Sequence, residues 1–321
     1  MNYVVFFIYL GVKTLYRMKK LLFILAAVLL AACSSEPQYA TRAEKLLAEI
    51  HNPASDYVMV ISHRGDWRNY PENSIPAIES VIRMGVDIVE IDIKKTKDGV
   101  LVLSHDQTIN RMFNGSGRIS EMTYDSLKTF RLKRAHGIAT DSLHVATLEE
   151  ALMVCKDRIL VNLDHAWGYY DEAIAVAEKV GCVDQILMKG SSPIEEVDAK
   201  FASHENNFMY MPIINIQRES GKKLFNAYKE IGLGTQIAYE VCWDKNTPEV
   251  AECMKEIVES GSKAWANTIW GSLCGYLDDD AALEKGVEAA YAPVVDMGVT
   301  MIQTDRPEFL ISYLRSRGLH D

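Results

Sequence analysis

Short apolar runs alternate with longer amphipathic segments along most of the chain. Segments with helical spacing of apolar residues lie between most of these runs, and several of them are followed by a glycine, as many helices are. This alternation is typical of an α/β protein with a parallel sheet. The apolar runs predict strands at residues 57–62, 86–93, 100–104, 158–164, 185–189, 208–215, 235–241, 263–267 and 299–305.

One link between predicted strands is too short for a parallel connection. Only residues 94–99 separate the second strand from the third, and they contain the turn pair Asp98-Gly99. Because a parallel crossover needs about a dozen residues or more, these two strands must form an antiparallel hairpin, with 100–104 as an arm. The remaining strands, in βα order, predict a (β/α)8 TIM barrel with a small insertion, residues 105–147, after the arm.

The N-terminal residues 1–32 have the pattern of a segment that is removed from the mature protein. A charged stretch at Met18–Lys20 precedes the apolar run "LLFILAAVLLAA". The run leads into "LAAC", Leu30–Cys33, which resembles a bacterial lipobox, whose cysteine is lipidated. We therefore expect a lipoprotein signal segment, and Cys33 as the membrane anchor of an extracytoplasmic protein facing the periplasm or the cell surface. A plain signal peptide or an uncleaved membrane helix is the alternative.

Two further parts follow the signal segment. Residues 33–55 begin with the polar tether "SSEPQYA" and continue into a short helix, in which Thr41 and Glu44 have the spacing of a capping box. Residues 56–315 are expected to form the barrel, including its insertion.

The composition describes a globular protein, and the charge excludes one class of partner. The chain has 321 residues, is 48% hydrophobic and carries a formal net charge of −10. Removing residues 1–32 takes away four basic residues and no acidic one, so the expected mature charge is −14. Because no basic cluster occurs along the chain, we expect no nucleic-acid partner. The five cysteines besides Cys33 form no CxxC pair, so neither zinc nor a redox pair is expected from them.

Polar and ionisable side chains stand at the carboxyl ends of the predicted barrel strands, where the chemistry of this fold belongs. Because these ends meet on one face, His63 and Arg64 are expected to face a shared acidic mouth. The residues at the strand ends are His63, Arg64, Glu90, Asp92, Asp164, Lys189, Asn215, Glu240, Trp265, Asn267, Thr304 and Asp305.

Glu90 and Asp92 form the acidic centre of this mouth. Alternation along a strand points both carboxylates to the same side, with Cα atoms about 6.6 Å apart. The strand is apolar around them and hence buried, so the pair would repel unless a cation lay between them. Asp164 ends the next barrel strand and can supply a third oxygen, and an all-carboxylate site favours one hard divalent ion, Mg²⁺ or Ca²⁺. The alternative is a solvent-facing pair neutralised by lysines such as Lys94 and Lys95.

Two histidines and an arginine complete the expected site. His105 ends the arm, which can fold over the mouth, so His63 and His105 would flank one cavity. Imidazoles give and take protons near neutral pH, and the planar guanidinium of Arg64 suits a phosphate oxygen. A cation, an arginine and two imidazoles together describe phosphodiester hydrolysis. Either histidine alone could equally be structural, and His165, beside Asp164, is the one rival.

At this point the residues resemble a known family, that of the glycerophosphodiester phosphodiesterases. The resemblance covers about Ser62 to Pro307 and implies a TIM barrel that hydrolyses small-molecule glycerophosphodiesters to glycerol 3-phosphate and an alcohol, with one divalent cation. The stretches that carry it, in the family's order and spacing, are "HRGDWRNYPENSIPAI", "GVDIVEIDIKKTKDGVLVLSHDQTINRMFNGSG", "ATLEEAL", "RILVNLD" and "MIQTDRP".

The resemblance also implies residue roles. His63 and His105 would be the acid/base pair, and Arg64 would bind the phosphate. The ligands of the divalent cation would be Glu90, Asp92 and Asp164.

The chain departs from the family pattern at three places. The third metal acid, usually Glu in a pattern ending in Lys, is the shorter Asp164, which favours Ca²⁺ because Ca²⁺ tolerates irregular shells. The usual Ser-Phe after the next strand is replaced by "MKGSS", so Lys189 is expected to supply a charge to the phosphate. The usual Trp-Thr pair reads "WAN", Trp265 to Asn267. These changes leave the reaction type intact and bear on the alcohol group, for which Glu240 and Trp265 are candidate pocket residues.

Two other functions stay open. A tethered lipoprotein could bind a phosphodiester or a polyol without turnover, although a pure binder needs the charges and not the two histidines. A related phospholipid phosphodiesterase would need a broad apolar rim at the mouth, and the sequence shows no such run. No oligomeric state is predicted.

Overall fold

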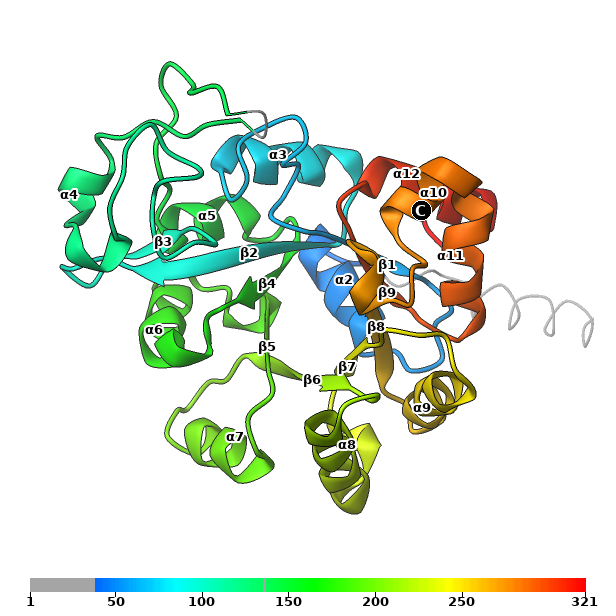
Figure 1. Cartoon of the computed structure of the whole chain (residues 1–321). Helices are drawn as coiled ribbons and strands as arrows, with labels where there is room; N and C mark the ends of the chain where they lie inside the picture. Colours follow the sequence, from blue (N-terminus) through cyan, green and yellow to red (C-terminus); the bar gives the residue numbers. More distant parts are fainter. Residues whose placement is uncertain (1–37, 135–136) are drawn as a thin grey trace, which may run out of the picture. The chain divides into compact units, whose positions relative to one another are not determined.

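The computed structural model describes residues 38–134 and 137–321, so the expected signal segment and Cys33 lie outside the described residues. Nine strands form one sheet, in which β1 pairs with both β2 and β9 and so closes a parallel barrel (Figure 1). The expected (β/α)8 barrel is therefore confirmed. The strands are β1 (Met59–Ser62), β2 (Ile88–Lys95), β3 (Leu101–Leu103), β4 (Leu160–Asp164), β5 (Ile186–Gly190), β6 (Met209–Asn215), β7 (Ala238–Cys242), β8 (Lys263–Asn267) and β9 (Met301–Thr304).

Helices follow the barrel strands along the chain, as the alternating pattern predicts. Several begin at capping side chains: Thr41 accepts a hydrogen bond from the Glu44 N–H, and Thr147 and Glu150 form a full capping box. The helices are α2 (Arg42–Ile50), α3 (Ile75–Met84), α4 (Tyr124–Leu127), α5 (Leu148–Cys155), α6 (Tyr170–Val180), α7 (Ile194–Phe201), α8 (Glu219–Ile231), α9 (Pro248–Glu259), α10 (Asp279–Lys285), α11 (Val287–Asp296) and α12 (Pro307–Ser316). Among the described residues, no helix is both long and apolar enough to cross a membrane.

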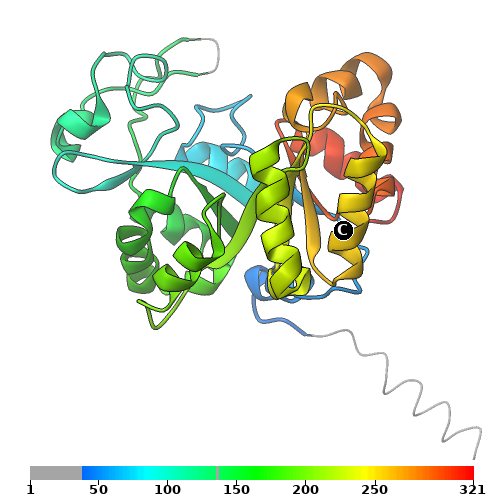
Figure 2. The same cartoon turned by 60° about the horizontal axis from the view of Figure 1, so that its bottom comes forward.

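The arm is an antiparallel hairpin of β2 and β3, as the short link requires. Ile93 pairs with Leu103 and Lys95 with Leu101, and Gly99 takes a left-handed conformation (φ +86°) in the turn. The segment after β3 packs around its own apolar cluster, which includes Ile109 and Phe113. In both views this segment and α4 lie on the opposite side of the barrel from α10 and α11 (Figures 1 and 2).

The barrel interior changes from apolar to polar along the strands. Leu46 and Ile50 of α2 pack against inward residues of the strands, including Ile88, Leu160 and Leu187. Because side chains alternate along a strand, the next inward positions lie two residues further toward the carboxyl ends. On six of the strands these next positions are polar and buried: Glu90, Asn162, Lys189, Glu240, Asn267 and Gln303. The buried polar side chains inside the barrel therefore lie toward the carboxyl ends of its strands.

Candidate active site

Three carboxylates meet where β2 and β4 lie side by side. The parallel register sets Asp92 opposite Asp164 and Glu90 opposite Asn162. One oxygen each from Glu90, Asp92 and Asp164 lies within 4.8 Å of the others. The structure therefore brings the three expected metal ligands together.

The acidic cluster fits a bound cation. Burial raises the pKa of Glu90 well above its usual range, and the charges of Asp92 and Asp164 raise it further. Glu90 Oε1 and Asp92 Oδ1 are buried, and neither has a hydrogen-bond partner among the described residues. A divalent cation would supply the missing positive charge and the missing contacts, and oxygen-only donors suit a hard ion.

Asp164 also pairs with a lysine. Lys189 Nζ lies 3.3 Å from Asp164 Oδ2 and 3.1 Å from Glu240 Oε2, and 5.6 Å from the centre of the Trp265 ring. Burial alone would raise the pKa of Asp164, but Lys189 and His165 outweigh it and lower the pKa to about 2. Asp164 is therefore held ionised. It belongs to the acidic cluster and also forms an ion pair with Lys189.

Three of the expected substrate-facing residues lie deeper than the sequence suggested. Lys189 is buried between two carboxylates, and its expected contact with phosphate stays a prediction. Glu240 accepts a hydrogen bond from Asn267 Nδ2 (2.8 Å), and Trp265 Nε1 donates to Asn267 Oδ1 (2.8 Å). Trp265 is fully buried in the apolar part of the barrel. Contact of Glu240 or Trp265 with substrate also stays a prediction.

Arg64 lies directly above the acidic cluster. Its backbone has a left-handed conformation (φ +55°), and its N–H donates to Glu90 Oε2 (2.8 Å). Its guanidinium is 3.3 Å from Asp92 Oδ2 through Nε and donates to Glu72 Oε1 through the terminal nitrogen (3.3 Å). The Glu72 carboxylate accepts hydrogen bonds in turn from two N–H groups of Arg111, each at 2.7 Å. The cationic side chain is therefore fixed at the edge of the cluster.

Asn73 orients the carboxylate of Asp92. Its Nδ2 donates to Asp92 Oδ2 (2.8 Å), and its Oδ1 accepts from the Asp92 N–H (2.9 Å). Asn73 has a positive φ (+54°), which Asn tolerates better than most residues. Because Asn73 and Arg64 contact Oδ2, the other oxygen, Oδ1, is the one left for an ion.

His63 is held by the carboxylate of Asp305, the residue that follows β9. Its Nδ1 lies 2.8 Å from Asp305 Oδ1, an oxygen that also accepts from Trp67 Nε1 (2.6 Å). The imidazole is buried and meets the edge of the Trp270 ring at a centroid distance of 5.8 Å. Since an ionised carboxylate only accepts, Nδ1 carries the proton and Nε2 is the free nitrogen.

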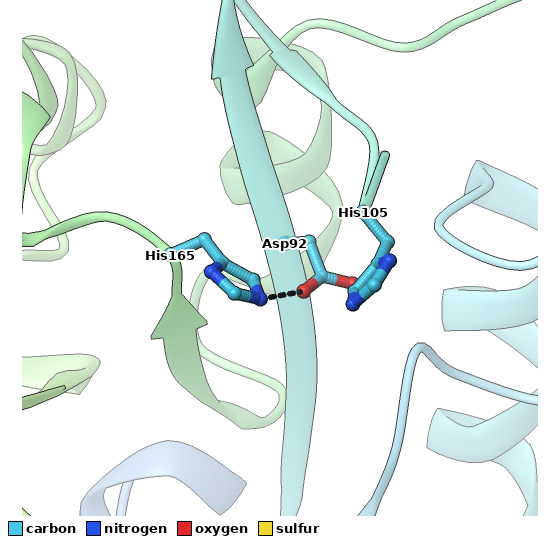
Figure 3. A group of neighbouring side chains, drawn as sticks. All are labelled: Asp92, His105 and His165. Atoms are coloured by element: carbon cyan, nitrogen blue, oxygen red, sulfur yellow. Dashed lines mark ion pairs between the residues drawn. The ribbon is translucent and has the colours of Figure 1, made fainter. Parts of the chain in front are cut away.

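His105 is held in the same way from the hairpin arm. Its Nδ1 lies 2.7 Å from Asp106 Oδ1. Hydrogen bonds from Arg111 outweigh burial and, together with His105, lower the pKa of Asp106 to about 2. The ring of His105 meets that of His165 edge to face at 5.2 Å, and His165 Nε2 lies 3.8 Å from Asp92 Oδ1. Figure 3 shows the Asp92 carboxylate between the two imidazoles.

Several functional contacts were not foreseen in the sequence. Glu72 and Asn73 belong to the "PEN" part of a quoted stretch, before α3, and Asp305 belongs to "TDRP". The family resemblance therefore included these residues, but no role for them followed from the sequence. Arg111, in the insertion, lies in the quoted stretch that contains His105 and was likewise given no role. Its role follows from its contacts with Glu72 and Asp106.

Comparison with known proteins supports the family resemblance. The glycerophosphoryl diester phosphodiesterase family model matches residues 63–208, and a domain of unknown function matches 210–314. The chain is 36% identical over 107 residues to a glycerophosphodiester phosphodiesterase of Caldanaerobacter subterraneus subsp. tengcongensis (33% of this chain, 44% of the relative). It is 32% identical over 155 residues to glycerophosphodiester phosphodiesterase 1 of Mus musculus (48% of this chain, 45% of the relative). The matches thus span less than half the length of these curated relatives.

Solved structures match over most of the chain. A glycerophosphoryl diester phosphodiesterase from Parabacteroides distasonis is 27% identical, with a TM-score of 0.71 over 86% of this chain and 92% of the other. An Oleispira antarctica phosphodiesterase, solved in complex with the product sn-glycerol-3-phosphate, is 20% identical, with a TM-score of 0.58 over 81% of this chain and 97% of the other. At that identity the second match supports the fold alone.

Proposed function

This chain belongs to the glycerophosphoryl diester phosphodiesterase family, and on that premise we propose that it hydrolyses glycerophosphodiesters to glycerol 3-phosphate and an alcohol. One observation carries the proposal: a buried acidic cluster, a fixed arginine and two carboxylate-held imidazoles meet at one end of the barrel. Fewer groups would suffice to bind an anion, whereas this set supplies charge neutralisation and proton transfer together.

We propose that Glu90, Asp92 and Asp164 hold one divalent cation. Their oxygens lie close enough to share an ion, and the buried oxygens without partners support the assignment. Oxygen donors favour Ca²⁺ or Mg²⁺, and the short Asp164 side chain, engaged by Lys189, favours the more tolerant Ca²⁺. When bound, the cation neutralises charge on the phosphate and polarises the bond that breaks.

The protein's own groups carry the remaining steps. Arg64 is placed to donate a hydrogen bond to a phosphate oxygen, since its Nε–H has no hydrogen-bond partner among the described residues. His63 and His105 each present Nε2, because Asp305 and Asp106 occupy their Nδ1 atoms. One imidazole, neutral at Nε2, takes the proton of the nucleophile, and the other, protonated at Nε2, gives a proton to the leaving alkoxide.

A release assay over a panel of glycerophosphodiesters, run with and without chelator, tests this function. We expect glycerol 3-phosphate to appear in metal-replete buffer, to stop on chelation and to resume on adding back Ca²⁺ or Mg²⁺. Tight binding of the diesters without any product would overturn the proposal and leave a binding protein.

A further inference from the structure

Two imidazoles face the Asp92 carboxylate from different elements, His105 from the end of the arm and His165 from the turn after β4 (Figure 3). One ligand atom from each of the three residues lies within 4.8 Å of the others. His165 directly follows Asp164, one of the positions at which the chain departs from the family pattern.

We propose that Asp92, His105 and His165 form a binding site for a transition-metal ion such as Zn²⁺, and that an ion bound there inhibits the enzyme. The inhibitory part rests on the hydrolysis proposed above. The binding part rests on the geometry of the three side chains alone.

The donor atoms are close to what Zn²⁺ requires. Bonds of about 2.0–2.1 Å in a tetrahedral shell set neighbouring ligand atoms about 3.3–3.4 Å apart. His165 Nε2 and Asp92 Oδ1 are already 3.8 Å apart. The His165 side chain is about half exposed, so a small rotation can close the remaining gap.

A second observation points to a ligand at this place. Asp92 is 1% exposed, and its Oδ1 has no hydrogen-bond partner among the described residues. Its other oxygen is held by Asn73, which fixes the carboxylate with Oδ1 toward His165. A buried, oriented oxygen without a partner costs free energy, and a metal ion removes that cost.

The surroundings of both imidazoles suit metal binding. A ligating histidine commonly donates its other N–H to a carboxylate, which fixes the ring and makes the ligating nitrogen more basic. Asp106 does this for His105, leaving Nε2 for a metal. His165 has a left-handed backbone (φ +54°), which sets the direction of its side chain just after β4.

The donor set distinguishes this site from the acidic cluster. Two nitrogens and one oxygen suit Zn²⁺, Co²⁺ and related ions, whereas Ca²⁺ and Mg²⁺ prefer oxygens only. The two sites share Asp92. An ion on the nitrogen side therefore takes an oxygen that the hard cation needs and also occupies His105 Nε2, which proton transfer needs.

Cobalt titration of the protein tests the binding directly. Starting from metal-free protein, we expect the visible d–d absorption of Co²⁺ bound to nitrogen and oxygen ligands, and displacement of Co²⁺ by Zn²⁺. His165→Ala should weaken Co²⁺ binding at least about tenfold, and Asp106→Asn, which loses the carboxylate behind His105, about tenfold or more. His144→Ala is the matched control, because His144 is exposed in the insertion, where its Nδ1 lies 3.4 Å from the Ser142 carbonyl oxygen. Equal Co²⁺ affinity in wild type and His165→Ala would overturn the site.

Zn²⁺ inhibition of hydrolysis tests the consequence. The Zn²⁺ concentration for half-inhibition should rise at least about tenfold in His165→Ala, each variant being compared with its own zinc-free rate. An unchanged value would overturn the inhibitory role. If no diester is hydrolysed at all, the proposed function fails while the Co²⁺ titration still decides the site. If hydrolysis occurs and wild type binds no Co²⁺, the inference fails alone.

Discussion

Replacing Glu90 by Gln should stabilise the metal-free protein while destroying its cation site. Glu90 is fully buried, its Oε1 has no hydrogen-bond partner among the described residues, and the charges of Asp92 and Asp164 add to the effect of burial in raising its pKa. In Glu90→Gln the amide oxygen can keep the hydrogen bond from the Arg64 N–H (2.8 Å). The amide NH₂ can then donate to a neighbouring carboxylate. A hydrogen bond thus replaces the repulsion between the Glu90 carboxylate and its acidic neighbours.

The expected change in stability follows from giving the unpartnered, buried Oε1 position of Glu90 a hydrogen-bond partner. A buried polar group left without a partner costs about 1–3 kcal/mol. The free energy of unfolding in chelator at pH 7 should therefore rise by about 1–3 kcal/mol in Glu90→Gln. For a barrel of this size that corresponds to a rise of about 2–6 °C in Tm. With Ca²⁺ at about 100 times its Kd, wild type should gain about 2.7 kcal/mol, and the variant should gain much less.

The matched control is a second buried glutamate whose pKa moves the other way. Burial would raise the pKa of Glu72, but hydrogen bonds from Arg111 and the charge of Arg64 outweigh it and lower the pKa. Glu72 therefore stabilises the fold above the ordinary carboxyl range and loses that contribution as pH falls through its lowered pKa. Glu72→Gln should be destabilising at pH 7.

The pH dependence of Glu90 has the opposite sign. Because its pKa is raised, its contribution is fully present below the ordinary carboxyl range, near about pH 4.3, and is lost as pH rises through the raised pKa. Urea unfolding in chelator, followed from about pH 4.5 to about pH 8, should show that the gain in free energy of unfolding of Glu90→Gln over wild type grows with pH. A variant less stable than wild type at pH 7, or one with an undiminished Ca²⁺ response, would refute this reasoning.

Three other changes test separate parts of the account. His63→Ala and His105→Ala should each lower kcat about 10²–10⁴-fold with the fold retained by circular dichroism, while His144→Ala should not; more than a third of wild-type activity in either variant would remove that histidine from the acid/base pair. Asp164→Asn should weaken Ca²⁺ affinity and activity together, with activity partly recovered at high Ca²⁺, and unchanged calorimetric affinity would mean that Asp164 is no ligand. Cys33→Ser should move the protein from the membrane to the soluble fraction, and unchanged partitioning would indicate an uncleaved helix in place of a lipid anchor.

The fold could be predicted because two simple constraints act on this sequence. Apolar runs marked the strands, and the short link at residues 94–99 decided which strand lies outside the barrel. The acidic cluster followed from the same reasoning, since parallel strands end on one face and alternation sets Glu90 and Asp92 on one side.

The rest depends on contacts that periodicity does not encode. His63 and Asp305 are 242 positions apart, so only the closed barrel shows that one holds the other. Lys189 was expected at the mouth because it ends a strand, but the inward direction of that position buries it between two carboxylates. His165 meets Asp92 through a left-handed turn, and turn geometry of this kind has no pattern in hydrophobicity.

The central claim is that the groups at the barrel mouth break the bond between phosphorus and the alcohol oxygen, so that glycerol keeps the phosphate. Phosphorus NMR of the products from one glycerophosphodiester, in Ca²⁺ and then in chelator, tests it most directly. We predict that the diester resonance is replaced by that of glycerol 3-phosphate in Ca²⁺ and persists unchanged in chelator. Persistence in both buffers, or release of the phosphorylated alcohol with free glycerol, would contradict the account.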